Sequence, residues 1–430
     1  MKRKALEDLL QWKDSLHRKP MILRGARQTG KTWLMKEFGK KAYKNYVYFN
    51  FDEQPELKSL FETNKNPHRL IELLSLITGI KIEPQHTLVI FDEIQECSEA
   101  LNALKYFYEK ANEYHIISAG SLLGTLLSSP KSYPVGMVNL LNIYPLSFEE
   151  FLQAVSSNLF TYYQTITPDT QIEDYFHHQL IELYNYYLII GGMPECVSSW
   201  LEEKNVQRIS QIQQELIEIY KNDFSKHNGK VNSGRILLTF NSIPSQLAKT
   251  NEKFIYGAIK SGARAREFEE AIEWLNAAGM VNKVHNVSKV AYPLPIYEKT
   301  DNFKLFLFDT GLLKTMAGIS NDAVLLNKEF QFRGALTENF VLQQLKTVLD
   351  VGPCFYADKN MELDFVIQLN DTLIPLEVKA GENVKSISLK KALNFDMFPY
   401  GIRFSKLNYK KEERIINLPL YLVNKINKIL

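Results

Sequence analysis

Two glycines, a lysine and a threonine near the N-terminus have a spacing that suits the binding of phosphate groups. Residues 25–32 read Gly-Ala-Arg-Gln-Thr-Gly-Lys-Thr and fit G-x-x-x-x-G-K-[ST] at every fixed position. Glycines let the backbone curl so that successive N–H groups point at phosphate oxygens, and the following helix adds its positive end. Lys31 would neutralise the β- and γ-phosphates, and the Thr32 hydroxyl would bind Mg²⁺. The residues predicted to bind ATP are Gly25, Ala26, Arg27, Gln28, Thr29, Gly30, Lys31 and Thr32.

A short apolar run that ends in two acids supplies the second half of such a site. Residues 88–93 read Leu-Val-Ile-Phe-Asp-Glu. Asp92 would hold Mg²⁺, directly or through water, and Glu93 would polarise the attacking water. Alone, the pattern is also typical of a helix whose first turn carries acids. Paired with the loop, it predicts an ATPase with Glu93 and Lys31 as catalytic residues and Thr32 and Asp92 as metal ligands.

A further polar position ends the segment 116–121, which reads Ile-Ile-Ser-Ala-Gly-Ser. Hydrolytic enzymes with such a loop place a γ-phosphate sensor on the strand beside it. Ser121 is therefore the predicted sensor, with Ser118 as the second choice. A serine is equally suited to cap the N-terminus of a helix, so both interpretations of Ser121 stay open.

A second group of charged residues lies near the C-terminus. Asp364 and Glu377 fall on successive apolar runs, and Lys379 shares a strand face with Glu377 because side chains alternate along a strand. This spacing resembles the PD-(D/E)xK nuclease core, in which Asp364 and Glu377 would share Mg²⁺ and Lys379 would activate water. Glu338, on the preceding helix, matches the accessory acid of such nucleases. The alternative is a cluster of surface ion pairs without catalytic activity.

The elements that must position these residues follow from hydrophobic periodicity. Short apolar runs alternate with helical patterns, such as 67–78 and 99–113, up to about residue 147. Strands that alternate with helices are typical of an α/β fold with a parallel sheet covered on both faces. The predicted strands are 21–23, 47–51, 87–91, 115–118 and 138–143.

Several motifs occur together in one known family. The phosphate-binding loop and Phe-Asp-Glu-Ile-Gln at 91–95 precede Tyr-Pro-Leu-Ser-Phe-Glu-Glu-Phe at 144–151. Gly-Gly-Met-Pro-Glu at 191–195, Phe-Asp-Thr-Gly-Leu at 308–312 and Gly-Ala-Leu-Thr-Glu-Asn-Phe at 334–340 follow. In this order they resemble the bacterial and archaeal AAA-type ATPases that carry a DUF4143 C-terminal region. The resemblance spans nearly the whole chain and implies ATP and Mg²⁺ as cofactors.

The chain departs from that family at one position. Such proteins usually have Gly-Arg just before the fifth strand, and here the pair is Gly136-Met137. If that arginine normally contacts phosphate from a neighbouring subunit, this chain would hydrolyse ATP slowly or act mainly as a nucleotide switch. Arg27, inside the loop, is not assumed to substitute for it.

Four domains are predicted from the pattern changes. They are a P-loop ATPase core at 1–147, a helical lid at 148–230, a winged-helix-like unit at 231–327 and a nuclease-like α/β domain at 328–430. In the third, short helices at 245–249, 254–260 and 264–277 would precede a wing made by strands 280–284 and 289–292.

The winged-helix-like unit raises the question of DNA. Lys260, Arg264 and Arg266 stand at or before the third helix, where phosphate contacts are natural. Four glutamates on the same helix oppose the approach of a polyanion. Contact with DNA through this unit and the C-terminal domain, and a role in packing against a protein partner, both remain open.

Composition narrows the class of protein. Of the 430 residues, 45% are hydrophobic and 23% charged, with a net charge of +2, so charge gives no global argument for nucleic acid. Three distant cysteines and the lack of a long apolar run predict a cytoplasmic protein outside the membrane. The favoured hypothesis is an ATP-hydrolysing switch. The alternatives are a metal-dependent nuclease regulated by ATP and a non-enzymatic nucleotide-binding interaction protein, and the oligomeric state is left open.

Overall fold

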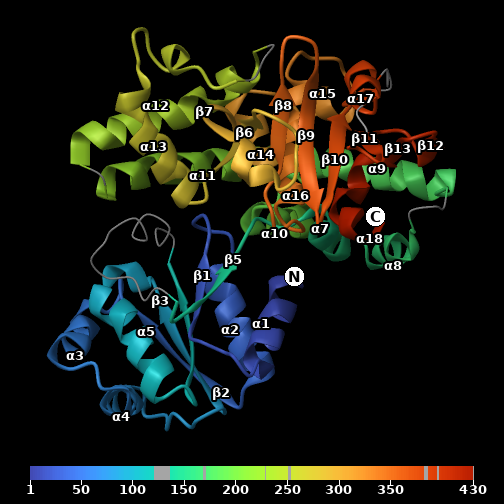
Figure 1. Ribbon diagram of the computed structural model, residues 1–430. Coiled ribbons are helices and arrows are strands. Elements are labelled where there is room, and N and C mark those ends of the chain that lie inside the picture. The colour runs from blue at the N-terminus through green and yellow to red at the C-terminus, as the bar shows by residue number, and fades with distance from the viewer. Residues whose placement is uncertain are drawn as a thin grey trace. The chain divides into compact units, whose positions relative to one another are not determined.

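The computed structural model describes residues 1–120, 136–167, 171–227, 229–249, 253–381, 386–394 and 397–429 (Figure 1). These residues form two compact units. The first unit contains Met1–Tyr144 and Ala277–Met280, and the second contains Pro145–Asn276 and Val281–Leu430. The prediction of four domains stays a prediction.

The first unit is built on a parallel sheet, as the apolar runs predicted. Its described strands have the order β2-β3-β4-β1-β5, and each neighbouring pair is parallel. The loop after β1 therefore lies at the same edge as the acids that end β3. The strands are β1 (Met21–Arg24), β2 (Asn45–Asn50), β3 (Thr87–Asp92), β4 (His115–Ala119) and β5 (Asn139–Asn142).

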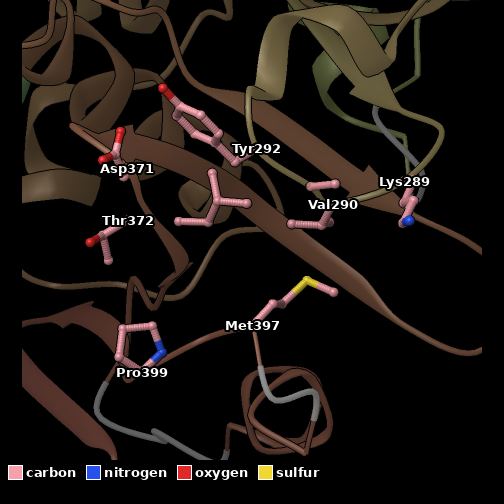
Figure 2. Close-up of a pocket in the computed structure, with 9 residues that line it drawn as sticks. Lys289, Val290, Tyr292, Asp371, Thr372, Met397 and Pro399 are labelled. Carbon is pink, nitrogen blue, oxygen red and sulfur yellow. The ribbon is translucent and has the colours of Figure 1, made fainter.

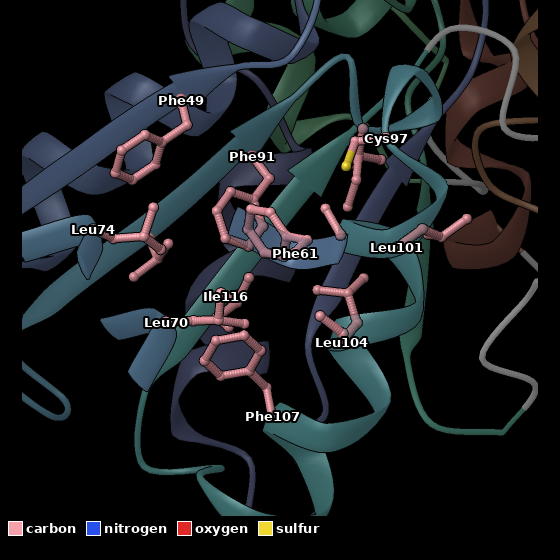
Figure 3. Packing of buried hydrophobic residues seen from close by; sticks show 14 of the residues in the cluster. Phe49, Phe61, Leu70, Leu74, Phe91, Cys97, Leu101, Leu104, Phe107 and Ile116 are labelled. Atoms are coloured by element: carbon pink, nitrogen blue, oxygen red, sulfur yellow. The ribbon is translucent and has the colours of Figure 1, made fainter. Parts of the chain in front are cut away.

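Helices pack on the two faces of this sheet because the strands bury alternate residues on opposite sides. Ile116 contributes to the core against α3, α4 and α5, whereas Ile117 contributes to the core against α1 and α2. Figure 3 shows the first of these cores, in which Phe61 and Phe91 meet edge to face with ring centres 5.7 Å apart. The helices are α1 (Ala5–Asp14), α2 (Lys31–Ala42), α3 (Lys58–Thr63), α4 (Pro67–Thr78) and α5 (Ser98–Lys110), with short 3₁₀ turns η1 (Pro55–Leu57) and η2 (Ile94–Glu96).

The second unit begins with a helical region, as predicted, and ends with a mixed sheet surrounded by further helices (Figure 1). The first helices are α7 (Phe148–Val155), α8 (Ser157–Thr165), α9 (Asp174–Ile190), α10 (Pro194–Glu203), α11 (Val206–His227), α12 (Gly229–Leu247) and α13 (Ala265–Ala277). The later ones are α14 (Thr310–Met316), α15 (Asn321–Leu325), α16 (Arg333–Leu345), α17 (Ile387–Ala392) and α18 (Ile426–Ile429). Short 3₁₀ turns are η3 (Tyr256–Ala258), η4 (Leu294–Tyr297) and η5 (Leu420–Lys425).

The mixed sheet has the order β12-β13-β11-β10-β9-β8-β6-β7 in the described part of the unit. Strands from both sides of residue 328 contribute to it, so the third and fourth predicted segments share one sheet. The strands are β6 (Val281–Val287), β7 (Glu298–Leu307), β8 (Cys354–Ala357), β9 (Glu362–Leu369), β10 (Thr372–Val378), β11 (Gly401–Ser405), β12 (Lys410–Glu412) and β13 (Ile415–Pro419).

Three predicted elements of the winged-helix-like unit differ from the structure. Residues 245–247 are the end of the long helix α12 and form no separate short helix. Residues 254–260 contain only the single turn η3 instead of a second helix. The partner of β6 is β7, and residues 289–292 form no strand. Pro293 and Pro295 follow that segment and lack the N–H groups that a ladder needs, whereas the end of β7 is a continuous buried run.

Among the described residues, no helix combines the length and apolar character needed to cross a bilayer.

Candidate functional site

The loop at 25–32 adopts backbone conformations that favour glycine. Gly25 has φ of 141° and Gly30 has φ of 90°, and even Gln28 is left-handed at 63°. A Cβ added to Gly25 would lie 2.2 Å from the carbonyl oxygen of Ile143. Position 25 therefore requires glycine, because its φ is positive and because no side chain fits beside Ile143. The loop then leads directly into α2.

Lys31 is buried at the first position of α2 and turns back onto the loop. Its Nζ donates to the carbonyl oxygens of Gly25 at 3.0 Å and Ala26 at 2.7 Å. Burial lowers the pKa of Lys31 to about 8, although Glu93 and Asp92 oppose this shift. An ammonium group in such surroundings is suited to exchange two carbonyl contacts for phosphate oxygens.

The Thr32 hydroxyl meets the carboxylate that ends β3. Its Oγ1 donates to Asp92 Oδ2 at 2.6 Å, and Asp92 is only 3% exposed. Tyr48 on β2 donates to the same Oδ2 at 2.9 Å, and burial together with Asp92 raises the pKa of Tyr48. Hydroxyl and carboxylate oxygens are ligands that Mg²⁺ prefers, so Thr32 and Asp92 fit a magnesium ion.

Glu93 lies in a sharp turn directly after Asp92. Its φ of 48° is left-handed, and its N–H donates to Asp92 Oδ1 at 3.1 Å. Gln95 Nε2 donates to Glu93 Oε2 at 2.5 Å. The 3₁₀ turn η2 follows, so α5 begins only at Ser98 and Glu93 is not in its first turn. Gln95 thereby orients the carboxylate that was predicted to polarise water.

The C-terminal residues also come together, within the second unit. Lys379 Nζ lies 3.0 Å from Glu377 Oε1. Asp364 Oδ2 accepts a hydrogen bond from the Val378 N–H at 2.7 Å, and the charge of Glu338 on α16 acts on Asp364. Burial, then the negative charge of Glu338, raises the pKa of Asp364 to about 8.

A buried lysine that the sequence did not single out joins this cluster. Lys304 on β7 is 1% exposed, and its Nζ lies 3.2 Å from Glu362 Oε1 and 3.7 Å from Glu338 Oε2. No group of three or more His, Cys, Asp or Glu residues in the described ranges is placed to hold a metal ion. Lys304 thus brings positive charge to this cluster, and the predicted metal-binding role of Asp364 and Glu377 stays a prediction.

Comparison with known protein families finds a match at each end of the chain. Residues 17–152 match a family described as AAA domain, and residues 333–423 match the Domain of unknown function (DUF4143). The chain carries an AAA domain and a DUF4143 domain. Between them, residues 181–323 match another Domain of unknown function (DUF8612). The comparison with curated proteins finds no match.

Solved structures similar to this chain include AMPPCP-bound DnaA from Aquifex aeolicus, at 13% identity and a TM-score of 0.31, covering 64% of this chain and 87% of that one. The ADP form of the Aeropyrum pernix ORC2 protein has 14% identity and a TM-score of 0.30, covering 75% and 92%. The Aeropyrum pernix ORC1 protein in complex with DNA has 13% identity and a TM-score of 0.26, covering 74% and 91%. Scores at this level support no argument about function.

Of the two serines predicted as a γ-phosphate sensor, only Ser118 is among the described residues. Ser121 is one of the residues the structure does not describe, so its role stays a prediction. Ser118 on β4 is fully buried, and its Oγ has no hydrogen-bond partner among the described residues. It shares the sheet face of Ile116, toward α3–α5, opposite the face on which α2 packs. That placement does not favour Ser118 as a contact for phosphate.

Three polar partners of the candidate sites were missed by sequence reasoning: Tyr48, Gln95 and Lys304. Of the three, only Gln95 belongs to a recognised motif, the segment Phe-Asp-Glu-Ile-Gln at 91–95. Tyr48 and Lys304 lie on strands, where a tyrosine is usually part of the core and a lysine usually keeps its charged end in water. Their positions at the sites depend on strand pairing, such as that of β2 with β3.

A hollow in the second unit lies apart from the predicted residues. It has a volume of about 400 Å³, and Figure 2 shows Tyr292 and Asp371 on one side and Met397 on another. A hydrogen bond to Asp371 raises the pKa of the Tyr292 hydroxyl. None of the residues predicted to bind ATP or to form the nuclease-like cluster lines this hollow.

Proposed function

We propose that the AAA domain binds ATP with Mg²⁺ and hydrolyses it, and that nucleotide occupancy acts as a switch on the second unit. The observation that carries this proposal is the 2.6 Å contact between the Thr32 hydroxyl and the Asp92 carboxylate. These two oxygens come from the loop and from the acidic strand. A site of this kind needs both motifs at one edge of the sheet.

Each residue then has a distinct role. Thr32 and Asp92 would hold Mg²⁺, which neutralises charge on the phosphates when bound. Lys31 exchanges its contacts with the loop carbonyls for the β- and γ-phosphates, where its charge stabilises the transferred group. Glu93, oriented by Gln95, polarises the attacking water. The loop N–H groups position the triphosphate.

Two substitutions test these roles. Lys31→Ala should abolish binding of a fluorescent ATP analogue. Glu93→Gln should keep the affinity for ATP within a few fold and slow phosphate release by about a hundredfold or more, the usual effect of losing a general base. Glu96→Gln, on the same turn, is the matched control and should release phosphate at the wild-type rate.

Unchanged phosphate release by Glu93→Gln would remove Glu93 from its role. Retained ATP binding without any turnover in the wild type would favour the alternative of a non-enzymatic nucleotide-binding interaction protein. Wild-type protein that binds no triphosphate would contradict the proposal as a whole.

The other candidate function is a metal-dependent nuclease regulated by ATP. In its favour, Asp364, Glu377, Lys379 and Glu338 lie in one cluster with the residue types of a PD-(D/E)xK core. Against it, Lys304 is already paired with Glu338 and Glu362, so its positive charge opposes the binding of a further cation beside them. We therefore favour a binding or structural role for the DUF4143 domain.

Contact with DNA stays a prediction, as does contact with a protein partner. Glu267, Glu269, Glu270 and Glu273 all lie on α13, and Glu273 pairs with Lys283 at 2.7 Å. This negative surface weakens the case for a phosphate backbone along α13.

A further inference from the structure

Arg3 joins the phosphate-binding loop to Tyr144, the last residue of the first unit's N-terminal segment. Its Nη1 donates to the carbonyl oxygen of Thr29 at 2.9 Å, and its Nη2 donates to that of Tyr144 at 2.7 Å. The side chain is buried at 7% exposure. The planar guanidinium is pre-organised to donate in two directions, so it loses less freedom per hydrogen bond than the flexible ammonium of a lysine. One residue outside every motif thus holds two separate backbone segments.

The same segment contacts the loop at a second point. Ile143 donates its N–H to the Arg24 carbonyl at 2.8 Å, as a continuation of the pairing between β1 and β5. The Ile143 carbonyl packs so closely on Gly25 that no side chain fits between them. Residues 142–144 are therefore attached at both the beginning and the end of the loop.

Residues 146–148 are attached just as firmly, within the second unit. The Leu146 N–H donates to the Gly192 carbonyl at 2.6 Å, and the Leu146 carbonyl accepts from the Tyr187 hydroxyl. The Phe148 N–H donates to Gln344 Oε1 at 2.7 Å. Ser147 caps α7 together with Glu150. Pro145, which lies between the two attached parts, has its φ fixed by its ring.

The attachment in the second unit includes several motifs that the proposed ATPase chemistry does not use. The Gly192 N–H donates to Asp309 Oδ2 at 2.7 Å, and Gln343 Nε2 donates to the same oxygen at 3.2 Å. Gln343 also donates to the Tyr187 hydroxyl at 3.0 Å. The side chains of Asp309 and Gln343 are buried. This network links α9, α14 and α16 to the residues that follow Pro145.

We propose that Arg3 is a positioning residue that couples nucleotide occupancy of the loop to the second unit through residues 142–148. Phosphates that bind the loop N–H groups fix the Thr29 carbonyl, and Arg3 then fixes the Tyr144 carbonyl. Because Pro145 is stiff, the ordering extends to the amides of Leu146 and Phe148, and from there to the buried network. The proposal rests on ATP binding by the AAA domain and specifies how that binding is transmitted.

Amide hydrogen exchange across residues 145–152 measures this coupling directly. On addition of a non-hydrolysable ATP analogue with Mg²⁺, exchange of this peptide in the full-length protein should slow by about tenfold, within the usual range for coupled sites. Arg3→Gln should retain analogue binding and lose most of the slowing. Arg3→Lys should recover only part of it.

Matched variants separate coupling from general damage. Arg18→Gln removes another arginine that bonds to a backbone carbonyl of the first unit, that of Asn112, and should leave the slowing intact. Pro145→Gly leaves Arg3 untouched. This variant should bind the analogue and lose the slowing of exchange, because the segment between Tyr144 and Leu146 is then flexible. This second variant tests the proposal even if Arg3→Gln fails to fold.

The outcomes distinguish the two proposals. Analogue binding by wild-type protein without any change in exchange at 145–152 would overturn the coupling and leave the ATP site standing. Slowing that persists in both Arg3→Gln and Pro145→Gly would also overturn it. Failure of the wild type to bind the analogue would overturn both.

Discussion

Lys31 and Lys304 are both buried ammonium groups, and their neighbours decide what each can do. Among the described residues, the hydrogen bonds of the Lys31 ammonium group go to the neutral carbonyl oxygens of Gly25 and Ala26, so a triphosphate offers it a stronger, charged partner. Lys304 already has Glu338 and Glu362 beside it. Removal of one partner from a buried ion pair leaves an uncompensated charge, which is costly. Lys304 therefore stabilises the acidic cluster in its present form.

This reading predicts that the acidic cluster gains metal affinity only when Lys304 is removed. The test uses an Asp92→Ala variant, in which the ATP site is disabled. Electron paramagnetic resonance should show that Mn²⁺ binds only weakly to the acidic cluster of this variant. Lys304→Met should strengthen that binding about tenfold or more, because one nearby positive charge is lost. Lys283→Met, on neighbouring β6, is the matched control and should change nothing. Tight Mn²⁺ binding that Asp364→Ala abolishes, or cutting of DNA or RNA with Mn²⁺, would contradict the prediction.

Individual elements show why some predictions succeeded. The runs that became β1 to β5 are apolar and short, and the helical patterns between them have the right period. The predicted partner of β6 was wrong because β6 pairs with β7, which begins only after a proline-rich turn. The apolar pattern of 289–292 indicated a strand, yet nothing local specifies which segment pairs with which.

Strand β4 makes the stability of the first unit dependent on pH. His115 is 5% exposed and its Nδ1 lies 2.7 Å from the Tyr43 hydroxyl. Burial, and then the positive charges of Arg18 and Lys13, lowers the pKa of His115 to about 3. The unfolded chain, with an ordinary histidine, takes up a proton first as the pH falls through about 6.5. The free energy of unfolding should therefore fall between pH 7 and 5, by up to about 2 kcal/mol.

Urea denaturation of the wild type and of His115→Gln at pH 7 and pH 5 checks this effect. The difference between the two proteins isolates His115 from the other groups that titrate in this range. Equal losses of stability in both would show that His115 does not cause the dependence.

At the scale of the whole molecule, each unit has its own core. Phe91 is fully buried in the first unit among Phe49, Phe51 and Phe61 (Figure 3). Phe340 is fully buried in the second, with its ring centre 4.9 Å from that of Tyr184. The two aromatic clusters belong to separate sets of contacts.

Calorimetry should therefore resolve two unfolding transitions that respond to different substitutions. Phe91→Ala should destabilise only the first unit, by about 3–5 kcal/mol, and Phe340→Ala only the second by a similar amount. The two substitutions themselves assign the transitions, because Phe91 lies in the first unit and Phe340 in the second. A single transition that both substitutions shift equally would contradict this expectation.

The sequence by itself determined the loop conformation, the acid that follows β3 and the parallel sheet between them. These depend on local rules: glycine where φ is positive, and apolar runs of strand length. Only the tertiary structure placed Tyr48 at Asp92, Lys304 among the C-terminal acids and Arg3 between Thr29 and Tyr144. The contact of Arg3 with Tyr144 joins residues distant in the chain, and hydrophobic periodicity carries no information about such pairs. Side chains of this kind meet because packed strands and helices bring them together.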